Sequence, residues 1–111
     1  MKGSRSVVTG GAGFIGSNLV DHLVRIDHKV IVLDNFVSGK KANLAHHKKK
    51  DVKIIRVDIS KSKNLDKYFK KVDYVFHLAG LAEIIPSIKN PKKYFNTNVL
   101  GTLKVVEAAK R

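Results

Sequence analysis

The stretch that most constrains the fold of this chain is residues 9–16, which read Thr-Gly-Gly-Ala-Gly-Phe-Ile-Gly. It follows a short apolar run and opens an amphipathic stretch, a pattern that predicts a glycine-rich turn between a strand and a helix. In such a turn Gly13 lets the backbone approach a ligand, and Gly16 permits close packing of the helix on the strand. The amides from Gly13 to Ile15 would lie at the start of the helix, where free N–H groups and the helix dipole favour an anion.

An acidic residue follows the glycines at the spacing of a dinucleotide site. Residues 29–33 have the near-continuous β-branched composition of a strand buried on both faces, and Asp34 ends it, 18 residues after Gly16. A carboxylate there can accept both hydroxyls of an adenosine ribose; its alternative role is to cap a turn. A 2′-phosphate would be repelled by about 1–4 kcal/mol. The sequence therefore predicts NAD in preference to NADP, an inference that the nearby Lys40 and Lys41 weaken.

The remaining sequence alternates strand and helix patterns. Strands are expected at residues 4–9, 29–33, 52–57 and 72–78, and helices at residues 13–26, 43–46, 60–71 and from residue 90 onward. Such alternation produces a parallel sheet with right-handed crossovers and helices on both faces. At 111 residues the chain has the size of one domain. We predict an α/β, Rossmann-like domain of four βα units over residues 1–111, with strand order 3-2-1-4.

The spacing of apolar residues predicts which side each helix buries. The first helix would bury Ile15, Leu19, Leu23 and Ile26, and the last would bury Phe95, Val99, Leu103 and Val106. The helix at residues 60–71 would turn Leu65, Tyr68 and Phe69 inward. Strand order 3-2-1-4 leaves the fourth strand as a flat apolar edge, so we expect the isolated chain to be marginally stable or to self-associate through that edge.

The charge balance is unusual, with 22 Lys and Arg against 9 Asp and Glu and a net charge of +13. Polyanion binding is therefore an alternative function. The lysines, however, are scattered in short groups near expected loops and helix ends, so we expect a solvated surface and neither a nucleic-acid nor a membrane partner. There is no cysteine, no signal-peptide pattern and no apolar run near the ~18 residues of a membrane span. These features predict a cytoplasmic protein without disulfides.

Three sites outside the glycine turn carry polar residues of interest. His77 ends the fourth strand, at the sheet edge where α/β proteins bind ligands, but a lone histidine there is more often structural than catalytic. His46 and His47 precede a lysine triplet and have no carboxylate in the neighbouring sequence. We therefore expect them in a solvated loop and expect no metal site. Asp58, which ends the third strand, is equally suited to contact an adenine or to cap the following helix.

With these features in place, the chain resembles the extended short-chain dehydrogenase/reductase family, in particular its NAD-dependent sugar-nucleotide epimerases and dehydratases. The matching motifs occur in order over essentially the whole chain: TGGAGFIGSN at 9–18, LDN at 33–35, VDI at 57–59, HLAG at 77–80 and NVLGTLKVVEAA at 98–109. HLAG, followed by Pro86-Ser87, Asn90-Pro91 and Tyr94, looks more like UDP-glucose 4-epimerases than like dehydratases or UDP-glucuronate decarboxylases. Ala82 departs from the lysine that some galactose epimerases have at this position.

The resemblance implies contacts for individual residues along bound NAD. Pyrophosphate contacts would come from Gly10, Gly13, Phe14, Ile15 and Gly16. The adenosine ribose would be held by Asp34 and Asn35, with Ser38 and Gly39 nearby, and the adenine by Asp58 and Ile59. The nicotinamide end would be lined by Leu78, Ala79, Gly80 and Leu81, with Asn98 near its ribose or an ordered water.

The family oxidises a sugar hydroxyl with a Tyr-x-x-x-Lys pair, in which the lysine lowers the tyrosine pKa. None of the three tyrosines, Tyr68, Tyr74 and Tyr94, has a lysine four residues later, so we assign no catalytic residue in this chain. Because family members are much longer, the resemblance implies the NAD-binding N-terminal portion of a UDP-sugar 4-epimerase, inactive alone. The alternatives are a portion of a sugar-nucleotide dehydratase or decarboxylase, and a non-catalytic NAD-binding module.

Overall fold

The computed structural model of the 111-residue chain describes residues 3–37, 39–61, 65–79 and 89–110. Four strands, β1 (Arg5–Thr9), β2 (Lys29–Asp34), β3 (Val52–Arg56) and β4 (Tyr74–His77), form one parallel sheet in the order β3-β2-β1-β4. Val8 of β1 pairs with Val32 on one side and with Phe76 on the other. The predicted α/β fold class and strand order are confirmed.

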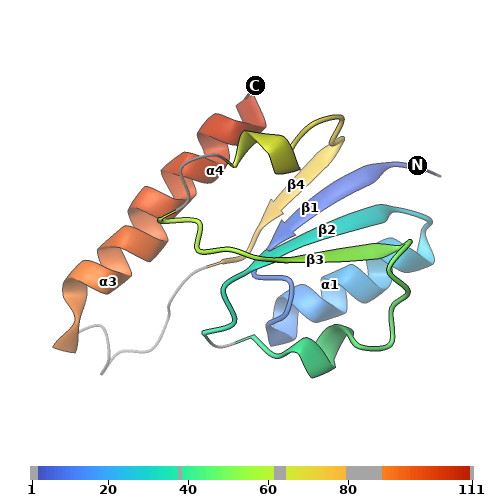
Figure 1. The fold of residues 1–111 in the computed structure, drawn as a ribbon, viewed down its shortest axis with the longest axis horizontal. Helices are drawn as coiled ribbons and strands as arrows, with labels where there is room; N and C mark the ends of the chain where they lie inside the picture. Colours follow the sequence, from blue (N-terminus) through green and yellow to red (C-terminus); the bar gives the residue numbers. More distant parts are fainter. Residues whose placement is uncertain (1–2, 38, 62–64, 80–88, 111) are drawn as a thin grey trace.

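Helices lie on both faces of the sheet (Figure 1). One face carries α1 (Phe14–Arg25) and the short 3-10 helix η1 (Lys41–Leu44), which begins two residues before the helix expected at 43–46. The other face carries α4 (Gly101–Lys110), the last part of a continuous helical segment that starts with α3 (Pro91–Phe95) and passes through the π-helical η3 (Asn96–Leu100). None of the helices in the described ranges is both long enough and apolar enough to cross a membrane.

Alternate residues of the central strands build two apolar cores, one on each face of the sheet. Val8 is buried against Val20 of α1 on one face. Val7, the preceding residue, is buried in a second cluster that contains Val105 of α4. Burial on both faces explains why the strand at residues 29–33 is almost continuously apolar rather than alternating.

The helix predicted at residues 60–71 is wrong. In the described part of this segment the structure has a single 3-10 turn, η2 (Asp66–Tyr68). The segment starts as a turn instead, because Asp58 Oδ1 accepts hydrogen bonds from both the N–H and the hydroxyl of Ser60. The residues expected to face inward nevertheless pack in the core beside α4: Leu65, Tyr68 and Phe69. These apolar residues have the spacing of a helix, but they are buried by a short connection that contains only one 3-10 turn in its described part.

The buried stripe predicted for the last helix is wrong as well. The four residues are more than half exposed: Phe95, Val99, Leu103 and Val106. The helix turns toward the sheet a second stripe with the same spacing, made of Thr97, Gly101, Val105 and Ala108. Three of these have small side chains, which let the helix backbone lie close to the strands. Periodicity alone does not distinguish the two stripes.

The face of α1 is shifted in the same way. Leu23 is buried and Leu19 packs against the core, as predicted. Ile15, however, is 70% exposed, and Gly16 and Val20 are buried on the sheet side of the helix. The absence of a side chain at Gly16 brings this part of α1 close to the strands, and that contact sets which face is buried.

His77 joins β1, β4 and α4 through both of its ring nitrogens. The Thr9 hydroxyl accepts the N–H groups of Leu78 (3.0 Å) and Ala79 (3.1 Å). Its own proton therefore goes to His77 Nδ1, 2.6 Å away, and His77 Nε2 donates to Thr102 Oγ1 at 2.7 Å. These bonds fix a neutral imidazole, and burial lowers the pKa of His77 below its ordinary value of 6.5. His77 is thus a structural crosslink, the role that the sequence favoured.

We expect acidification to destabilise the fold through His77. Because its pKa in the folded chain lies below that in the unfolded chain, the unfolded state binds the proton first. The stabilisation is complete above pH 6.5 and is lost as the pH falls through the folded-state pKa. Denaturant unfolding at about pH 7.5 and about pH 5.5 should show a smaller loss of unfolding free energy in His77→Asn, which does not titrate. An equal loss in both proteins would contradict this assignment.

Candidate dinucleotide-binding site

The glycine-rich turn brings the ends of three strands together. Gly10 has a φ of +70°, and its N–H donates to Leu33 O at 2.8 Å. A Cβ at Gly10 would lie 2.8 Å from Ala79 N, and a Cβ at Gly16 would collide with Gly10 O. Both positions require glycine, because the atoms opposite belong to the backbone and cannot swing away. The turn therefore holds the start of α1 at the carboxyl ends of β1, β2 and β4.

The first turn of α1 has the features of an anion site. Gly13 is its N-cap residue, with no side-chain cap among the described residues and no acidic residue in the turn. The N–H groups of Phe14, Ile15 and Gly16 therefore lack the carbonyl partners of interior helix amides, and the helix dipole adds partial positive charge. The side chains of Phe14 and Ile15 are largely exposed. Backbone groups, rather than these side chains, give the turn its affinity for an anion.

Asp34, at the end of β2, uses both carboxylate oxygens to bind the backbone. Oδ2 accepts from Ala12 N (3.0 Å) and Oδ1 accepts from Phe36 N (2.7 Å). The buried side chain thus joins the glycine turn to the segment after β2, which is the turn-forming alternative considered from the sequence. Each carboxylate oxygen can accept a further hydrogen bond, so the same group can also hold ribose hydroxyls. No sequence pattern pointed to the contact with Ala12.

A groove of about 100 Å³ follows the carboxyl ends of the strands. Eight of the residues predicted to contact a dinucleotide line it: Gly10, Gly13, Asp34, Asn35, Gly39, Ile59, Leu78 and Ala79. A second cavity of about 410 Å³ adjoins it and is lined by Asp58. Four other predicted residues, Phe14, Ile15, Gly16 and Asn98, are not in the lining of either cavity. The last three, Ser38, Gly80 and Leu81, lie outside the described residues.

Sequence reasoning missed four residues of the groove lining: Leu33, Val37, Val57 and Thr97. Leu33 and Val57 are strand-end neighbours of predicted residues, so strand ends as a class could have identified them. Thr97 is buried and contributes to both cavities. It belongs to the sheet-facing stripe of the last helical segment, and it was missed because the other stripe was expected to face inward.

Asp58 caps the turn that follows β3. Its Oδ1 accepts from Ser60 N at 2.9 Å and from Ser60 Oγ at 2.6 Å. Burial raises the pKa of Asp58, but the hydrogen bonds from Ser60 and the charge of Lys61 outweigh it, so the pKa lies below its ordinary value of 3.8. Asp58 is therefore a carboxylate at neutral pH. The capping role is present, and the position in the second cavity leaves the group available to a ligand.

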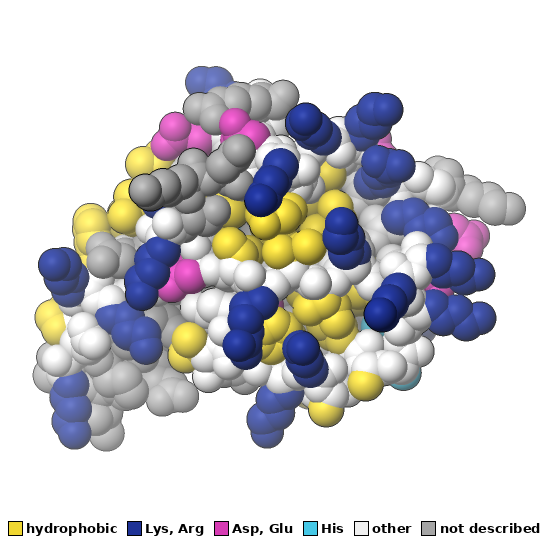
Figure 2. Space-filling model, in the orientation of Figure 1, with side chains coloured by type: hydrophobic (Ala, Val, Ile, Leu, Met, Phe, Trp, Pro, Cys, Tyr) yellow, Lys and Arg dark blue, Asp and Glu magenta, His cyan; other side chains and the backbone are white. Residues whose placement is uncertain are grey.

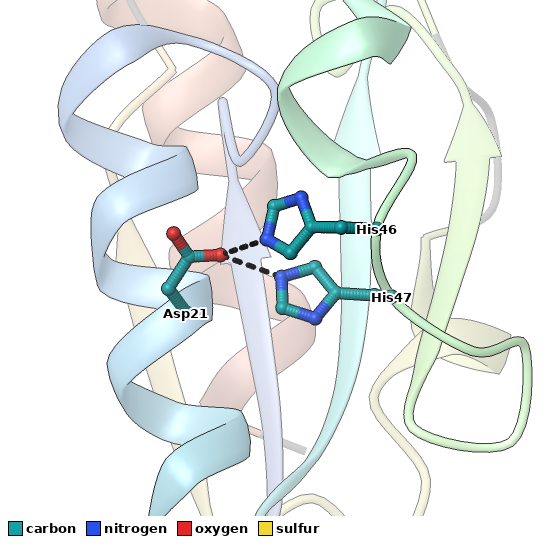
Figure 3. Close-up of side chains that lie close together, drawn as sticks. All are labelled: Asp21, His46 and His47. Carbon is teal, nitrogen blue, oxygen red and sulfur yellow. Dashed lines mark hydrogen bonds and ion pairs between the residues drawn. The ribbon is translucent and has the colours of Figure 1, made fainter.

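The expectation that His46 and His47 lack a carboxylate partner is wrong. Both Nε2 atoms hydrogen-bond to the same oxygen, Oδ1 of Asp21 on α1, at 2.7 and 2.6 Å (Figure 3). Burial raises the pKa of Asp21, but the hydrogen bonds and charges of the two histidines outweigh it and lower the pKa below 3.8. Asp21 lies 25 residues before His46, so proximity in the sequence gave no signal.

The basic side chains can be followed on one face of the molecule. Figure 2 shows Lys and Arg spread over the visible face, around apolar side chains, rather than gathered into a single patch. Lysines spread in this way give a broadly positive surface potential. Five basic residues nevertheless line a cavity of about 390 Å³: Arg5, Lys29, Lys49, Lys50 and Lys53. The groove at the carboxyl ends of the strands differs from this cavity because it combines the glycine turn with the carboxylate of Asp34.

The chain is similar in sequence to a known protein family and to curated proteins. The family model "NAD dependent epimerase/dehydratase family" matches residues 6–111. Among curated proteins, UDP-glucuronic acid decarboxylase 2 of Arabidopsis thaliana is 44% identical over 111 residues, which are 99% of this chain and 24% of that protein. The chain thus spans about a quarter of the length of that protein and of two further decarboxylases of Arabidopsis thaliana.

Solved structures with a similar fold include epimerases. UDP-N-acetylglucosamine 4-epimerase from Methanobrevibacter ruminantium, in complex with UDP-N-acetylmuramic acid, is 44% identical with a TM-score of 0.90; the match covers 99% of this chain and 35% of that one. UDP-glucose 4-epimerase from Thermus thermophilus, in complex with NAD, is 38% identical with a TM-score of 0.80; the match covers 94% and 33%. The relatives therefore include both epimerases and decarboxylases of UDP-sugars.

Proposed function

We propose, since the chain belongs to the NAD dependent epimerase/dehydratase family, that the groove at the carboxyl ends of its strands binds NAD. The observation that carries the proposal is Gly13. Its backbone, with φ −76° and ψ 178°, suits any residue, and among the described atoms a Cβ there would meet only Gly10 O, at 3.4 Å. The turn itself does not demand a glycine at this position. A phosphate that approaches the first turn of α1 does.

Individual parts of the dinucleotide can be assigned to residues at this end of the sheet, as part of the proposal. We assign the pyrophosphate to the first-turn amides of α1, the adenosine ribose to Asp34 and Asn35, and the adenine to the side of Asp58 and Ile59. The nicotinamide end is assigned to Leu78 and Ala79 with their neighbours Gly80 and Leu81, and Asn98 to the nicotinamide ribose. Bound NAD would accept a hydride from a sugar carbon.

We further propose that the reaction served is the 4-epimerisation of a UDP-sugar. The support is the 44% identity and TM-score of 0.90 with the archaeal 4-epimerase. Decarboxylation of a UDP-sugar acid is the second candidate, supported by the 44% identity with the plant decarboxylase. In either case the role of these residues is to hold the cofactor, because no tyrosine of the chain has a lysine four residues later. We expect the 111-residue chain to be inactive alone.

Self-association through the edge of the sheet also belongs to this proposal. In the described part of the chain β4 pairs only with β1, so its other side is an edge. Tyr74, the first residue of this strand, and Leu78, the residue that follows it, are 41% and 42% exposed. A strand at the edge of a sheet with exposed apolar side chains favours pairing with another strand, and a second copy of the chain supplies one.

The substitution Gly13→Ala tests the proposal most selectively. We expect calorimetric titration to show NAD binding weakened by about tenfold or more, or about 1.4 kcal/mol, because the added methyl group stands where the phosphate approaches. The melting temperature should change little, because the restriction that alanine places on the unfolded chain is offset by its lower preference for the N-cap position of α1. Gly16→Ala is the control for a glycine that the fold itself requires. The Cβ added at residue 16 would collide with Gly10 O, so this variant should be less stable by about 1–3 kcal/mol. Unchanged NAD affinity in a stable Gly13→Ala would refute the assignment.

The discrimination between NAD and NADP depends on Asp34. We expect the wild-type chain to prefer NAD, and Asp34→Asn to reduce the ratio of the two affinities by about tenfold or more, because it removes a repulsion of about 1–4 kcal/mol. The ratio is the proper readout, since losing the carboxylate also weakens its bonds to Ala12 and Phe36 for both ligands. Asp51→Asn, at the opposite end of the sheet, should leave the ratio unchanged. A ratio equal in all three proteins would exclude Asp34 as the ribose contact.

A further inference from the structure

A second constellation of chemically active side chains lies away from the groove, where the segment after η1 meets α1. Asp21 extends from α1 toward His46 and His47, and both imidazoles point their Nε2 atoms at the same carboxylate oxygen (Figure 3). The three potential ligand atoms all lie within 4.8 Å of one another. We propose that Asp21, His46 and His47 form a binding site for a divalent transition-metal ion, with Zn²⁺ the best-suited occupant.

The set of donors selects the type of metal. Imidazole nitrogen and carboxylate oxygen are ligands that Zn²⁺, Co²⁺ and Ni²⁺ share, whereas Mg²⁺ and Ca²⁺ require several oxygen ligands. Three protein ligands leave one position of a tetrahedral site to water. The net charge of +13 and the lysines that follow His47 disfavour weakly held hard cations further. On so basic a surface, direct bonds from imidazole nitrogen favour Zn²⁺ over Mg²⁺ and Ca²⁺.

The spacing of the ligands is close to that of a metal site. Bonds of about 2.0–2.1 Å in tetrahedral geometry place neighbouring ligand atoms roughly 3.4 Å apart. The two nitrogens now lie 2.7 and 2.6 Å from Asp21 Oδ1, at hydrogen-bond distance. Relative to Asp21 Oδ1, each nitrogen therefore has to move back by less than about 1 Å to admit an ion. The two nitrogens, which lie within 4.8 Å of one another, have to take up the same ligand spacing by rotation of the side chains. When the ion binds, Nε2 of each histidine would lose its proton and would still point toward Asp21 Oδ1.

The candidate metal site is held by α1 and by the segment after η1, and it is open to solvent at His46. Asp21 follows Val20, which is buried in the core, and Leu44 of η1 is buried in the same core. The side chain of His47 is only 8% exposed, whereas that of His46 is 56% exposed. The ring centroids of the two histidines are 4.0 Å apart, so each limits the rotation of the other. A buried ligand and a fixed carboxylate give preorganisation, and the exposed histidine gives the ion a path of entry.

Such an ion would clamp the segment after η1 onto α1. The part of the chain just before this segment contacts the glycine turn, because Lys40 N, next to η1, and Asn43 Nδ2, within η1, both donate to Ala12 O, at 3.0 and 2.8 Å. A metal that binds only the folded chain stabilises it in proportion to the logarithm of its concentration. The site is therefore structural, and it stabilises the segment that directly follows η1, whose Asn43 contacts the glycine turn.

The test is a titration of the tag-free chain with ZnCl₂, followed by calorimetry and by thermal unfolding. We expect one Zn²⁺ per chain, a melting temperature that rises with Zn²⁺ concentration, and no binding of Mg²⁺. His47→Asn and His46→Asn should each weaken Zn²⁺ binding by at least about tenfold, since even losing a residue that supports a ligand costs this much. His46 is exposed, so its substitution leaves the fold intact and keeps the test valid if His47→Asn unfolds.

His22→Asn is the matched control, because it makes the same substitution at an exposed histidine next to Asp21 that is not part of the cluster. It should bind Zn²⁺ as the wild type does. With Co²⁺ in place of Zn²⁺, the visible absorption bands of a tetrahedral complex should appear in the wild type and in His22→Asn and be lost in His46→Asn. Absence of Zn²⁺ binding, or equal affinity in His46→Asn and the wild type, would overturn the proposal and leave the cluster as a pair of hydrogen bonds.

Discussion

The hydrogen bond from Ala12 N to Asp34 Oδ2 is the contact on which the site depends. It ties the glycine turn to the end of β2, so that the start of α1 and the carboxylate lie on the same groove. The carbonyl of Ala12 is equally occupied, since Lys40 N and Asn43 Nδ2 both donate to it. The backbone N–H and C=O of one residue, Ala12, thus fix the turn, the acidic residue and the segment leading to η1 relative to one another.

This arrangement explains why one carboxylate can have a structural and a ligand-binding role. Each carboxylate oxygen of Asp34 accepts one hydrogen bond from the backbone and can accept another, and the residue lines the groove. The backbone bonds prevent the side chain from rotating away, so a ribose would meet an acceptor that is already in place. Preorganisation of this kind lowers the entropy cost of binding. Two roles that were alternatives on the basis of sequence are compatible in three dimensions.

The sequence predicted those features that local chemistry determines. The glycine turn follows from spacing, because the backbone at Gly10 and Gly16 admits no other residue. The parallel sheet follows from the alternation of strands and helices, which also places Asp34 at the end of β2. Residues that meet only through the fold were not predicted. Asp21 reaches His46 from another element, and no spacing rule connects them. Thr97 was missed because two stripes of the last helix have the same period, and only contact with the sheet decides which one is buried.

The central claim is that the backbone amides at the start of α1 bind the pyrophosphate of NAD. Nuclear magnetic resonance of the ¹⁵N-labelled chain, titrated with NAD, tests it directly. If these amides bind the pyrophosphate, the signals of four of them should shift most and saturate together: Gly13, Phe14, Ile15 and Gly16. The shifts should be smaller with adenosine, which has no pyrophosphate. Saturable binding that leaves these four amides unmoved would contradict the claim.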